Sequence, residues 1–517
     1  MCSFLLSLPE VLGRHSGSKI AETVMEILSE FGIPGRIGYF VTDNASNNDT
    51  ALESIAEALG FNAQHRRLRC VGHILNLVAQ SILFGNNPAD LQVDIERATQ
   101  DIEELTLWRH HGPIGKLHNI VKYICHSPQR LQRFRETQQL DDIEISVPAH
   151  VQGTSSAQSW NLERDNETRW NSTYKMITRA LDLRKAVDRF MELEEMDHVR
   201  SARRVARGQG EALESQAVSF RQDILTADDW EILKTYRIML EPIWDSTMKL
   251  EGDAVEGRNG AIWEVLPVFE YILDHFWNLS ERFDLSDETE ERLKTSLELG
   301  IQKLDIYYKF LDDSPAYIAA VVLHPSFKWE WIESIWSEKP NGKTWIRKAK
   351  AAVQRLWRDE YKTLPVAEVL GGDDAPPAKR LKPNSKINSF LAKRSTVAQR
   401  PSPDSSSSDE YERYIKQPTI EAIMDDELNP ITWWESKRSQ MPRLSKMALD
   451  LLSIPAMSAK AERIFSHCGN IVRPNRARLH GDTLAAVVCL KQWESEGLVD
   501  WNGSNTDESS SIYNGAS

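Results

Sequence analysis

The sequence lacks a long apolar run. The longest, residues 317–323, falls far short of the roughly 20 residues that a helix needs to cross a bilayer. Residues 1–9 contain a short apolar stretch, but they lack the basic residues that open a secretory signal peptide. We therefore expect no transmembrane helix, no membrane partner and no signal peptide.

Cysteine is also scarce, with 5 in 517 residues. The five are scattered along the chain: Cys2, Cys70, Cys125, Cys468 and Cys489. An odd, scattered set does not resemble a disulfide framework, so we expect a reducing, intracellular compartment.

Positive charge is in deficit. The chain has 62 Lys and Arg against 76 Asp and Glu, a net charge of −14, and its sequence pI is near 5.5. This excludes a globally basic nucleic-acid binder, but it leaves room for local basic patches. Clusters within residues 130–135, 200–207 and 473–478 could contact phosphates. The alternative for each cluster is a solvated helix face.

What remains is the composition of a soluble globular protein, 41% hydrophobic and 27% charged. The length predicts two to four structural units, and the 16 tryptophans indicate large helical cores. Composition and hydrophobic pattern divide the chain into five parts. They are an α/β region at 1–90, an α-helical region at 91–365, a disordered linker at 366–409, a compact helical region at 410–497 and a disordered tail at 498–517.

Hydrophobic periodicity predicts the elements of the first region. Strands are expected at residues 4–8, 38–42 and 67–70, and helices at 20–31, 51–59 and 71–83. This alternation of strand and helix indicates an α/β unit.

Asp43 follows a buried strand inside the polar turn Thr-Asp-Asn-Ala-Ser-Asn-Asn at 42–48. An acid at the carboxyl end of such a strand is where α/β folds place ligand- or metal-binding groups. The alternative is that Asp43 or Ser46 caps the next helix.

Cys70 and His73 stand three residues apart at a strand-to-helix junction. They could form half of a zinc site, but structural zinc usually takes four ligands and no second pair lies nearby. Buried packing and hydrogen bonding are favoured, and no structural zinc is expected.

Arg169 and Trp170 adjoin at a predicted helix start. Together they could offer a phosphate contact and a stacking platform for an unpaired base. The alternative is a core tryptophan beside a surface arginine.

Near the C-terminus, Glu462 lies in a stretch of small residues that indicates a tightly packed helix. Taken alone, Glu462 could be an ordinary surface acid. The apolar stripe that follows, residues 485–493, suits a core or a partner helix. In the linker, Lys379, Arg380 and Lys382 form a short basic run that predicts a nuclear localisation signal, with a solubilising linker as the alternative.

Together these motifs resemble the hAT superfamily of DNA transposases. The resemblance rests on TDNASNN at 42–48, RCVGHILNL at 69–77, TRWNSTY at 168–174, SIPAMSAKAERIFSHCGNIV at 453–472 and RARL at 476–479. It implies a ribonuclease-H-like catalytic fold interrupted by a large all-α insertion domain, with a C-terminal dimerisation region that completes the catalytic fold. The implied location is the nucleus, and the implied partners are a second copy of the chain and transposon-end DNA.

The resemblance also implies roles for individual residues. Asp43 and Glu462 match the second and third of three catalytic, metal-binding carboxylates, which would hold a pair of Mg²⁺ or Mn²⁺ ions. Arg169 and Trp170 match positions that handle a hairpinned DNA intermediate. Cys70 and His73 match a Cys/His pair that supports the active site.

The sequence departs from the family pattern at its beginning. The first catalytic Asp and the N-terminal zinc-finger module are missing, so the catalytic fold is expected to be incomplete. We therefore expect a DNA-associating protein that dimerises but does not cleave DNA unaided. The alternatives are an active cut-and-paste transposase whose N-terminus is missing from the gene model, and a domesticated, non-enzymatic nuclear interaction protein.

Overall fold

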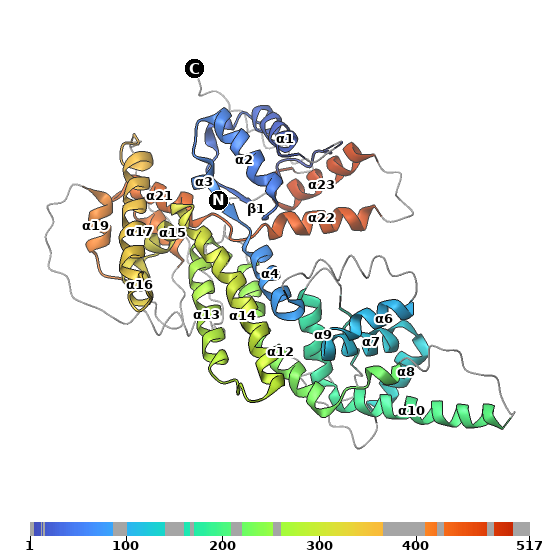
Figure 1. The fold of residues 1–517 in the computed structure, drawn as a ribbon. Coiled ribbons are helices and arrows are strands. Elements are labelled where there is room, and N and C mark those ends of the chain that lie inside the picture. Colours follow the sequence, from blue (N-terminus) through green and yellow to red (C-terminus); the bar gives the residue numbers. More distant parts are fainter. Residues whose placement is uncertain are drawn as a thin grey trace. The chain divides into compact units, whose positions relative to one another are not determined.

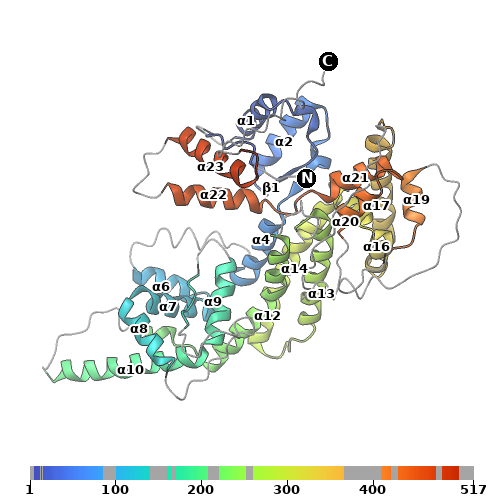
Figure 2. The same cartoon turned by 180° about the vertical axis from the view of Figure 1, so that it is seen from behind.

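The computed structural model describes residues 5–11, 13, 16–85, 101–139, 160–165, 170–207, 220–251, 260–365, 409–420, 429–472 and 480–499. Helices dominate the chain (Figures 1 and 2). It divides into two compact units, which are described separately. The first comprises Met1–His73, Lys249–Pro267 and Phe310–Ser517, and the second comprises the two intervening stretches, 74–248 and 268–309.

The N-terminal part of the first unit alternates helices and strands, as the periodicity predicts. Its elements are α1 (Gly17–Glu30), η1 (Pro34–Arg36), β1 (Phe40–Thr42), α2 (Ser46–Leu59), α3 (Ala63–Arg66), β2 (Arg67–Arg69) and the start of α4 (Val71–Phe84). α1 packs against α2 through a cluster around Ala21, Ala51 and Ile55. The predicted helices and the second and third predicted strands are confirmed to within a few residues.

The sheet is small. β1 and β2 pair in parallel, with Val41 opposite Leu68, and they form the only sheet among the residues that the structure describes. Because parallel strands end at the same edge, the turn after β1 and the residues after β2 lie close together.

The strand expected at residues 4–8 is wrong for its described part, because residues 5–8 have no regular structure. The carbonyl of Leu5 accepts a hydrogen bond from the Trp493 indole at 2.7 Å. Leu5 and Leu8 pack on an apolar cluster that includes Ile464 and Val488. Burial against helices, which needs no partner strand, holds this segment.

The rest of the first unit surrounds one apolar helix. The elements are η5 (Ile262–Glu264), η6 (Phe310–Asp312), α15 (Pro315–Leu323), α16 (Lys328–Trp336), α17 (Gly342–Leu356), η7 (Trp357–Tyr361), α19 (Glu410–Lys416), α20 (Pro430–Ser436), α21 (Pro442–Leu452), α22 (Ala459–Ile471) and α23 (Gly481–Ser495). Residues 316–323 of α15, which include the longest apolar run, are all buried, and α15 packs against α17, α21 and η5. In both views α22 and α23 lie beside α1 and α2, although more than 400 residues separate them in the chain.

The regular elements described in the second unit are all helices. Its elements are α4 from Ile74 on, α6 (Asp101–Arg109), α7 (Gly112–His126), α8 (Pro128–Thr137), α9 (Trp170–Asp182), α10 (Arg184–Ala206), η3 (Phe220–Asp223), α12 (Ala227–Leu250), α13 (Val265–Ser280) and α14 (Glu288–Lys309). Trp108 and Trp230 are each 1% exposed, in keeping with the helical cores expected from the tryptophan content. The unit does not coincide with the expected helical region at 91–365, because 249–267 and 310–365 group with the first unit.

Among the described residues, no helix combines the length and the apolar character needed to cross a membrane. The predicted nuclear localisation residues Lys379, Arg380 and Lys382 lie outside the described residues.

Candidate functional site

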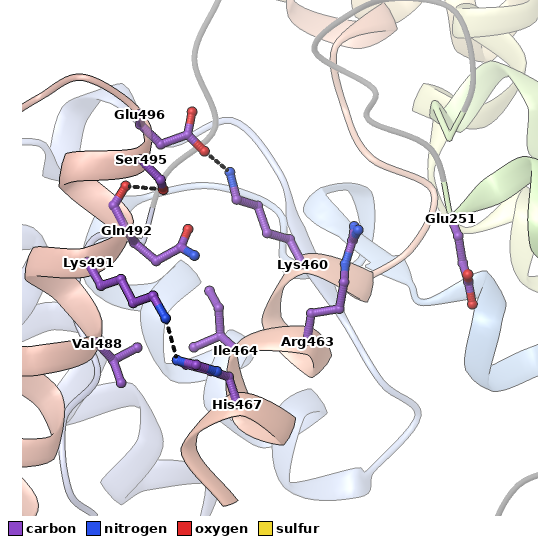
Figure 3. A pocket seen from close by; sticks show the side chains of 10 residues that line it. All are labelled: Glu251, Lys460, Arg463, Ile464, His467, Val488, Lys491, Gln492, Ser495 and Glu496. Atoms are coloured by element: carbon purple, nitrogen blue, oxygen red, sulfur yellow. Dashed lines mark hydrogen bonds and ion pairs between the residues drawn. The ribbon is translucent and has the colours of Figure 1, made fainter. Parts of the chain in front are cut away.

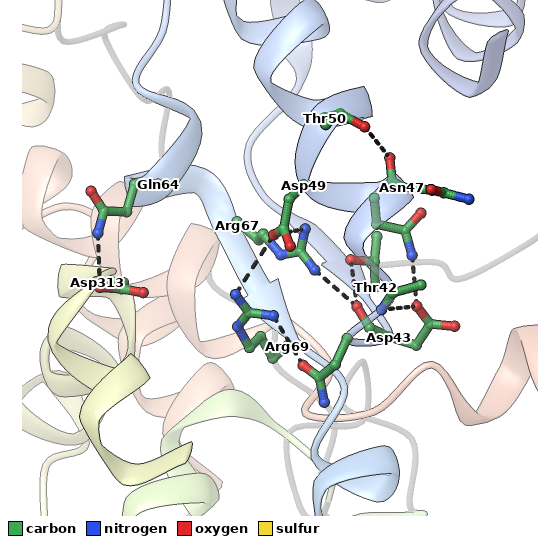
Figure 4. Close-up of polar contacts among 12 residues, drawn as sticks. Thr42, Asp43, Asn47, Asp49, Thr50, Gln64, Arg67, Arg69 and Asp313 are labelled. Atoms are coloured by element: carbon green, nitrogen blue, oxygen red, sulfur yellow. Dashed lines mark hydrogen bonds and ion pairs between the residues drawn. The ribbon is translucent and has the colours of Figure 1, made fainter. Parts of the chain in front are cut away.

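The acidic turn after β1 is held by its own first carboxylate. Asp43 is exposed, and its Oδ1 accepts hydrogen bonds from the Ala45 amide at 3.0 Å and from Asn48 Nδ2 at 2.7 Å. The N-cap of α2 is Ala45, which makes no side-chain capping bond. Asp43 therefore shapes the turn, and the alternative in which Asp43 or Ser46 is the N-cap is wrong. The other carboxylate oxygen of Asp43 points away from the turn (Figure 4).

Two arginines on β2 hold the same turn from the neighbouring strand. Arg67, 8% exposed, donates to the Asp43 carbonyl at 3.0 Å and forms an ion pair with Asp49. Arg69 donates to Asn44 Oδ1 at 3.2 Å. Burial and the nearby Arg69 lower the pKa of Arg67, and Asp49 opposes this shift.

Sequence reasoning missed Arg67 and Arg69 as site residues. They stand two apart on one strand, so both face the same side, and Leu68 between them is buried on the other. Two arginines spaced two apart on a strand, beside a turn that contains acids, are the pattern from which the sequence could have predicted this contact. The guanidinium of Arg69 also lies 4.2 Å from the centre of the Phe310 ring, in a cavity of about 440 Å³.

Cys70 joins the strand that precedes Asp43 to Ser458, the N-cap of the helix that carries Glu462. Its amide donates to the Thr42 carbonyl at 2.7 Å. Its buried Sγ accepts from the Ser458 amide at 3.4 Å and from the Ser458 hydroxyl at 3.2 Å. For Cys70, the prediction of buried packing and hydrogen bonding is confirmed. His73 lies half-buried in the first turn of α4.

The neighbours of Cys70 extend this contact. The Val71 amide donates to the Ala456 carbonyl at 3.0 Å. A Cβ on Gly72 would lie 2.2 Å from Met457 Cε, so only glycine lets the thioether approach this closely. Residues 70–72 thus dock side by side with residues 456–458.

Glu462 lies in the first turn of α22, four residues beyond this contact, and it is exposed. The segment before it is also held from its other side. The Ile262 amide donates to the Ile454 carbonyl at 2.9 Å, and the Ala456 amide donates to the Gly260 carbonyl at 2.8 Å. The position of Glu462 therefore depends on two separate parts of the chain.

A buried acid supports residues 260–262. Glu264 is 1% exposed, and its Oε2 accepts from the amides of Gly260 at 2.5 Å and Ala261 at 3.1 Å. Lys249 lies 3.4 Å from Oε1. Burial raises the pKa of Glu264 to about 7, against the effects of Lys249 and the two amides. Nothing in the local sequence marked this glutamate.

The resemblance implies that the site holds a pair of divalent ions. Asp43 and Glu462 offer oxygen ligands on elements that Cys70 connects. Within the described part of the chain, however, no three His, Cys, Asp or Glu side chains gather as metal ligands would. The described residues therefore do not fit a two-metal centre.

The proposed DNA-contacting pair lies in the second unit. Trp170 opens α9 and is 3% exposed, with its ring centre 6.3 Å from that of Trp244 and 6.2 Å from that of Tyr174. Arg169 lies outside the described residues. In this structure Trp170 is a core residue, and base stacking by it stays a prediction.

Comparison with known proteins identifies three regions of the chain. Residues 2–73 match the ZBED1 RNase-like domain, residues 68–215 match the ZBED1 RNase-like helical domain, and residues 410–494 match the hAT family C-terminal dimerisation region. The two RNase-like matches agree with a mostly helical chain that begins with an α/β region.

Full-length relatives were found in plants. The chain is 24% identical to "Zinc finger BED domain-containing protein RICESLEEPER 2" of Oryza sativa subsp. japonica, over 95% of the chain and 60% of the relative. It is 22% identical to "Putative AC transposase" of Zea mays, over 93% of the chain and 52% of that protein. The chain therefore spans about half to three fifths of the length of these relatives. Together with the matched dimerisation region, these relatives support the hAT superfamily for this chain.

Proposed function

We propose that this chain self-associates through its C-terminal region, binds DNA in the nucleus and does not cleave DNA unaided. The observation that carries self-association is the exposure of large apolar side chains inside the matched dimerisation region. Phe465 on α22 is 62% exposed and Val487 on α23 is 46% exposed. Other apolar residues of the same region, such as Trp434 and Leu451, are fully buried.

Exposed apolar surface on neighbouring helices favours contact with a second copy. Removal of apolar area from water stabilises an interface by about 25 cal/mol per Å². A twofold-symmetric dimer uses the same patch on both subunits, so each exposed side chain counts twice. Light scattering on the full chain should therefore report a mass above that of a monomer.

The matched test replaces exposed apolar residues inside and outside this region. Phe465→Ser/Val487→Ser should shift the mass towards the monomer. Leu285→Ser/Ile306→Ser, which changes residues 59% and 49% exposed in the second unit, should leave the mass unchanged. Equal masses for both double variants and the wild-type chain would contradict self-association through this face.

We further propose that β1, β2 and the helices around them belong to a ribonuclease-H-like fold. This proposal is supported by the parallel pair of strands and by the match of residues 2–73 to an RNase-like domain. In that fold Asp43 and Glu462 would be two of the three acids that position divalent ions. Among the residues that the structure describes, no third acid joins these two. Two acids alone do not stabilise both the attacking and the leaving oxygen, so we expect no strand cleavage.

A cleavage assay with Mg²⁺ or Mn²⁺ on transposon-end DNA tests this expectation. The chain as given should leave the DNA intact. Cleavage that is abolished by Asp43→Ala and by Glu462→Ala would overturn the proposal, since it would require a further acid. Cleavage only by a form extended at the N-terminus would support the alternative of an active transposase.

Nuclear location rests on the linker. Lys379, Arg380 and Lys382 supply a basic run that an acidic receptor groove could bind. A tagged Lys379→Ala/Arg380→Ala/Lys382→Ala variant should lose nuclear enrichment. An unchanged distribution would argue against the signal. A nuclear chain that self-associates but binds no DNA would instead be a domesticated interaction protein.

A further inference from the structure

We propose that the groove between α22 and α23 is a binding site for the phosphate backbone of DNA. The groove has a volume of about 610 Å³ and belongs wholly to the first unit. Its basic lining residues are Lys460, Arg463 and His467 on α22 and Lys491 on α23. The proposal rests on the DNA association proposed above and names the surface that would carry it.

The basic residues of α22 share one face. Lys460, Arg463 and His467 follow the spacing i, i+3, i+7, which places them in a row along the helix. Seven residues of helix span about 10 Å, a length that covers more than one phosphate of a strand. Lys491 approaches the same space from α23, and its side chain points towards His467 (Figure 3).

Several of these groups are not matched by a carboxylate. Arg463 donates through Nε to the Ala459 carbonyl at 3.3 Å, and no described residue bonds its two terminal nitrogens. Lys491 Nζ donates to His467 Nε2 at 3.4 Å, and within the described ranges no carboxylate pairs with either residue. A phosphate oxygen could accept from Arg463 and from Lys491.

The charge of the groove is opposite in sign to that of the chain. Lys460, Arg463 and Lys491 contribute +3, and the lining acids Glu251 and Glu496 contribute −2, so the groove carries +1 in a chain of net charge −14. Glu496 is engaged by Lys460 at 2.7 Å, at one end of the groove. Glu251 stands apart from the basic residues in Figure 3.

The basic cluster within residues 130–135 does not offer unmatched cations of this kind. Arg133 on α8 pairs with Glu194 and with Asp197, the latter at 2.7 Å. Arg130 donates to the Tyr123 carbonyl at 2.7 Å. Arg133 is thus neutralised by carboxylates of its own chain, whereas Arg463 and Lys491 line an open groove with no carboxylate partner among the described residues.

The groove lies beside the candidate catalytic residue Glu462. Arg463 directly follows Glu462 in the first turns of α22, so a strand held by Arg463 would pass close to the acid that the family pattern marks as catalytic. Phosphate contacts of this kind fix the position of DNA without reading its sequence. We therefore expect similar affinity for unrelated sequences.

The test measures DNA binding by the full chain with fluorescence anisotropy, using a labelled short duplex at several salt concentrations. Arg463→Gln/Lys491→Gln should weaken binding about tenfold and reduce the slope of log K against log salt by about two. The matched control, Lys343→Gln/Arg355→Gln, removes the same charge from exposed positions on α17 and should change affinity less than about twofold.

The outcomes separate the two proposals. If the wild-type chain binds no DNA, both the DNA association and the groove are overturned. If it binds and the groove variant behaves like the control, only the groove is overturned. Competition by polyglutamate as strong as that by unlabelled DNA would also overturn it, because the groove would then bind acidic polypeptide instead of phosphates.

Discussion

Replacement of Arg67 by glutamine tests how the acidic turn is held. The change removes a buried cation that donates to the Asp43 carbonyl and pairs with Asp49. A hydrogen bond from a charged donor contributes about 1.5–3 kcal/mol. The side chain of Asp49 is 41% exposed, so water screens its ion pair with Arg67 and the pair contributes little to stability. We therefore expect local destabilisation of the turn by about 2 kcal/mol.

Hydrogen exchange measured by mass spectrometry resolves this change locally. Two amides of the turn have partners there: Ala45 donates to Asp43 Oδ1 and Asn48 donates to the Ala45 carbonyl. A loss of about 2 kcal/mol should speed exchange of a peptide covering residues 42–50 about 30-fold. Arg36→Gln, an exposed position in the same unit, is the matched control and should leave that peptide unchanged. An unchanged rate in Arg67→Gln, or an equal rise in peptides of the second unit, would refute the reasoning.

Three further changes have defined outcomes. Gly115→Ala places a Cβ 1.7 Å from the Trp108 carbonyl oxygen, so the backbone must move. Thermal unfolding of the second unit should show that its free energy of unfolding falls by about 3 kcal/mol. A fall of less than about 1 kcal/mol would contradict this. Because burial raises the pKa of Glu264 to about 7, its contribution to stability is full below about pH 4.5 and falls as pH rises to about 7. In Glu264→Gln, the free energy of unfolding measured by urea titration should no longer fall over this pH range. A pH profile identical to that of the wild-type chain would contradict the assignment of the fall to Glu264. Because burial lowers the pKa of Lys328 to about 8, stability should rise between about pH 8 and 10.5. Lys328→Met should abolish this rise. It should also release α19, because the Tyr414 carbonyl on that helix accepts a hydrogen bond from Lys328 Nζ at 2.8 Å. A rise in stability that persists in the variant would show that another group causes it.

The local elements of the first unit were predictable because their signals are local. The strand before Asp43 was expected to end at Thr42 and does so, since a buried apolar run meets a polar turn there. The helix expected from residue 71 begins at Val71 and ends one residue late. Each of these boundaries depends on neighbours within a few positions.

The contacts of the candidate site were not predictable in the same way. Asp43 and Glu462 were singled out by motif, but the bond from Ser458 to the Cys70 thiol joins residues 388 apart. Arg67 is buried although arginine is usually exposed, because its partners belong to the turn after another strand. No local pattern specifies such partners.

The isolated bridge between Ala261 and Pro455 has a consequence for how the chain folds during synthesis. The segment from Ile454 to Ser458 is held on one side by residues 260–262 and on the other by residues 70–72. The strands that precede Asp43 and Cys70 leave the ribosome early, but the segment that completes their packing is made nearly 400 residues later. At about 5–20 residues per second, translation leaves them without that segment for tens of seconds. These two strands therefore have to remain soluble through this delay, and they reach their native packing long after they are made.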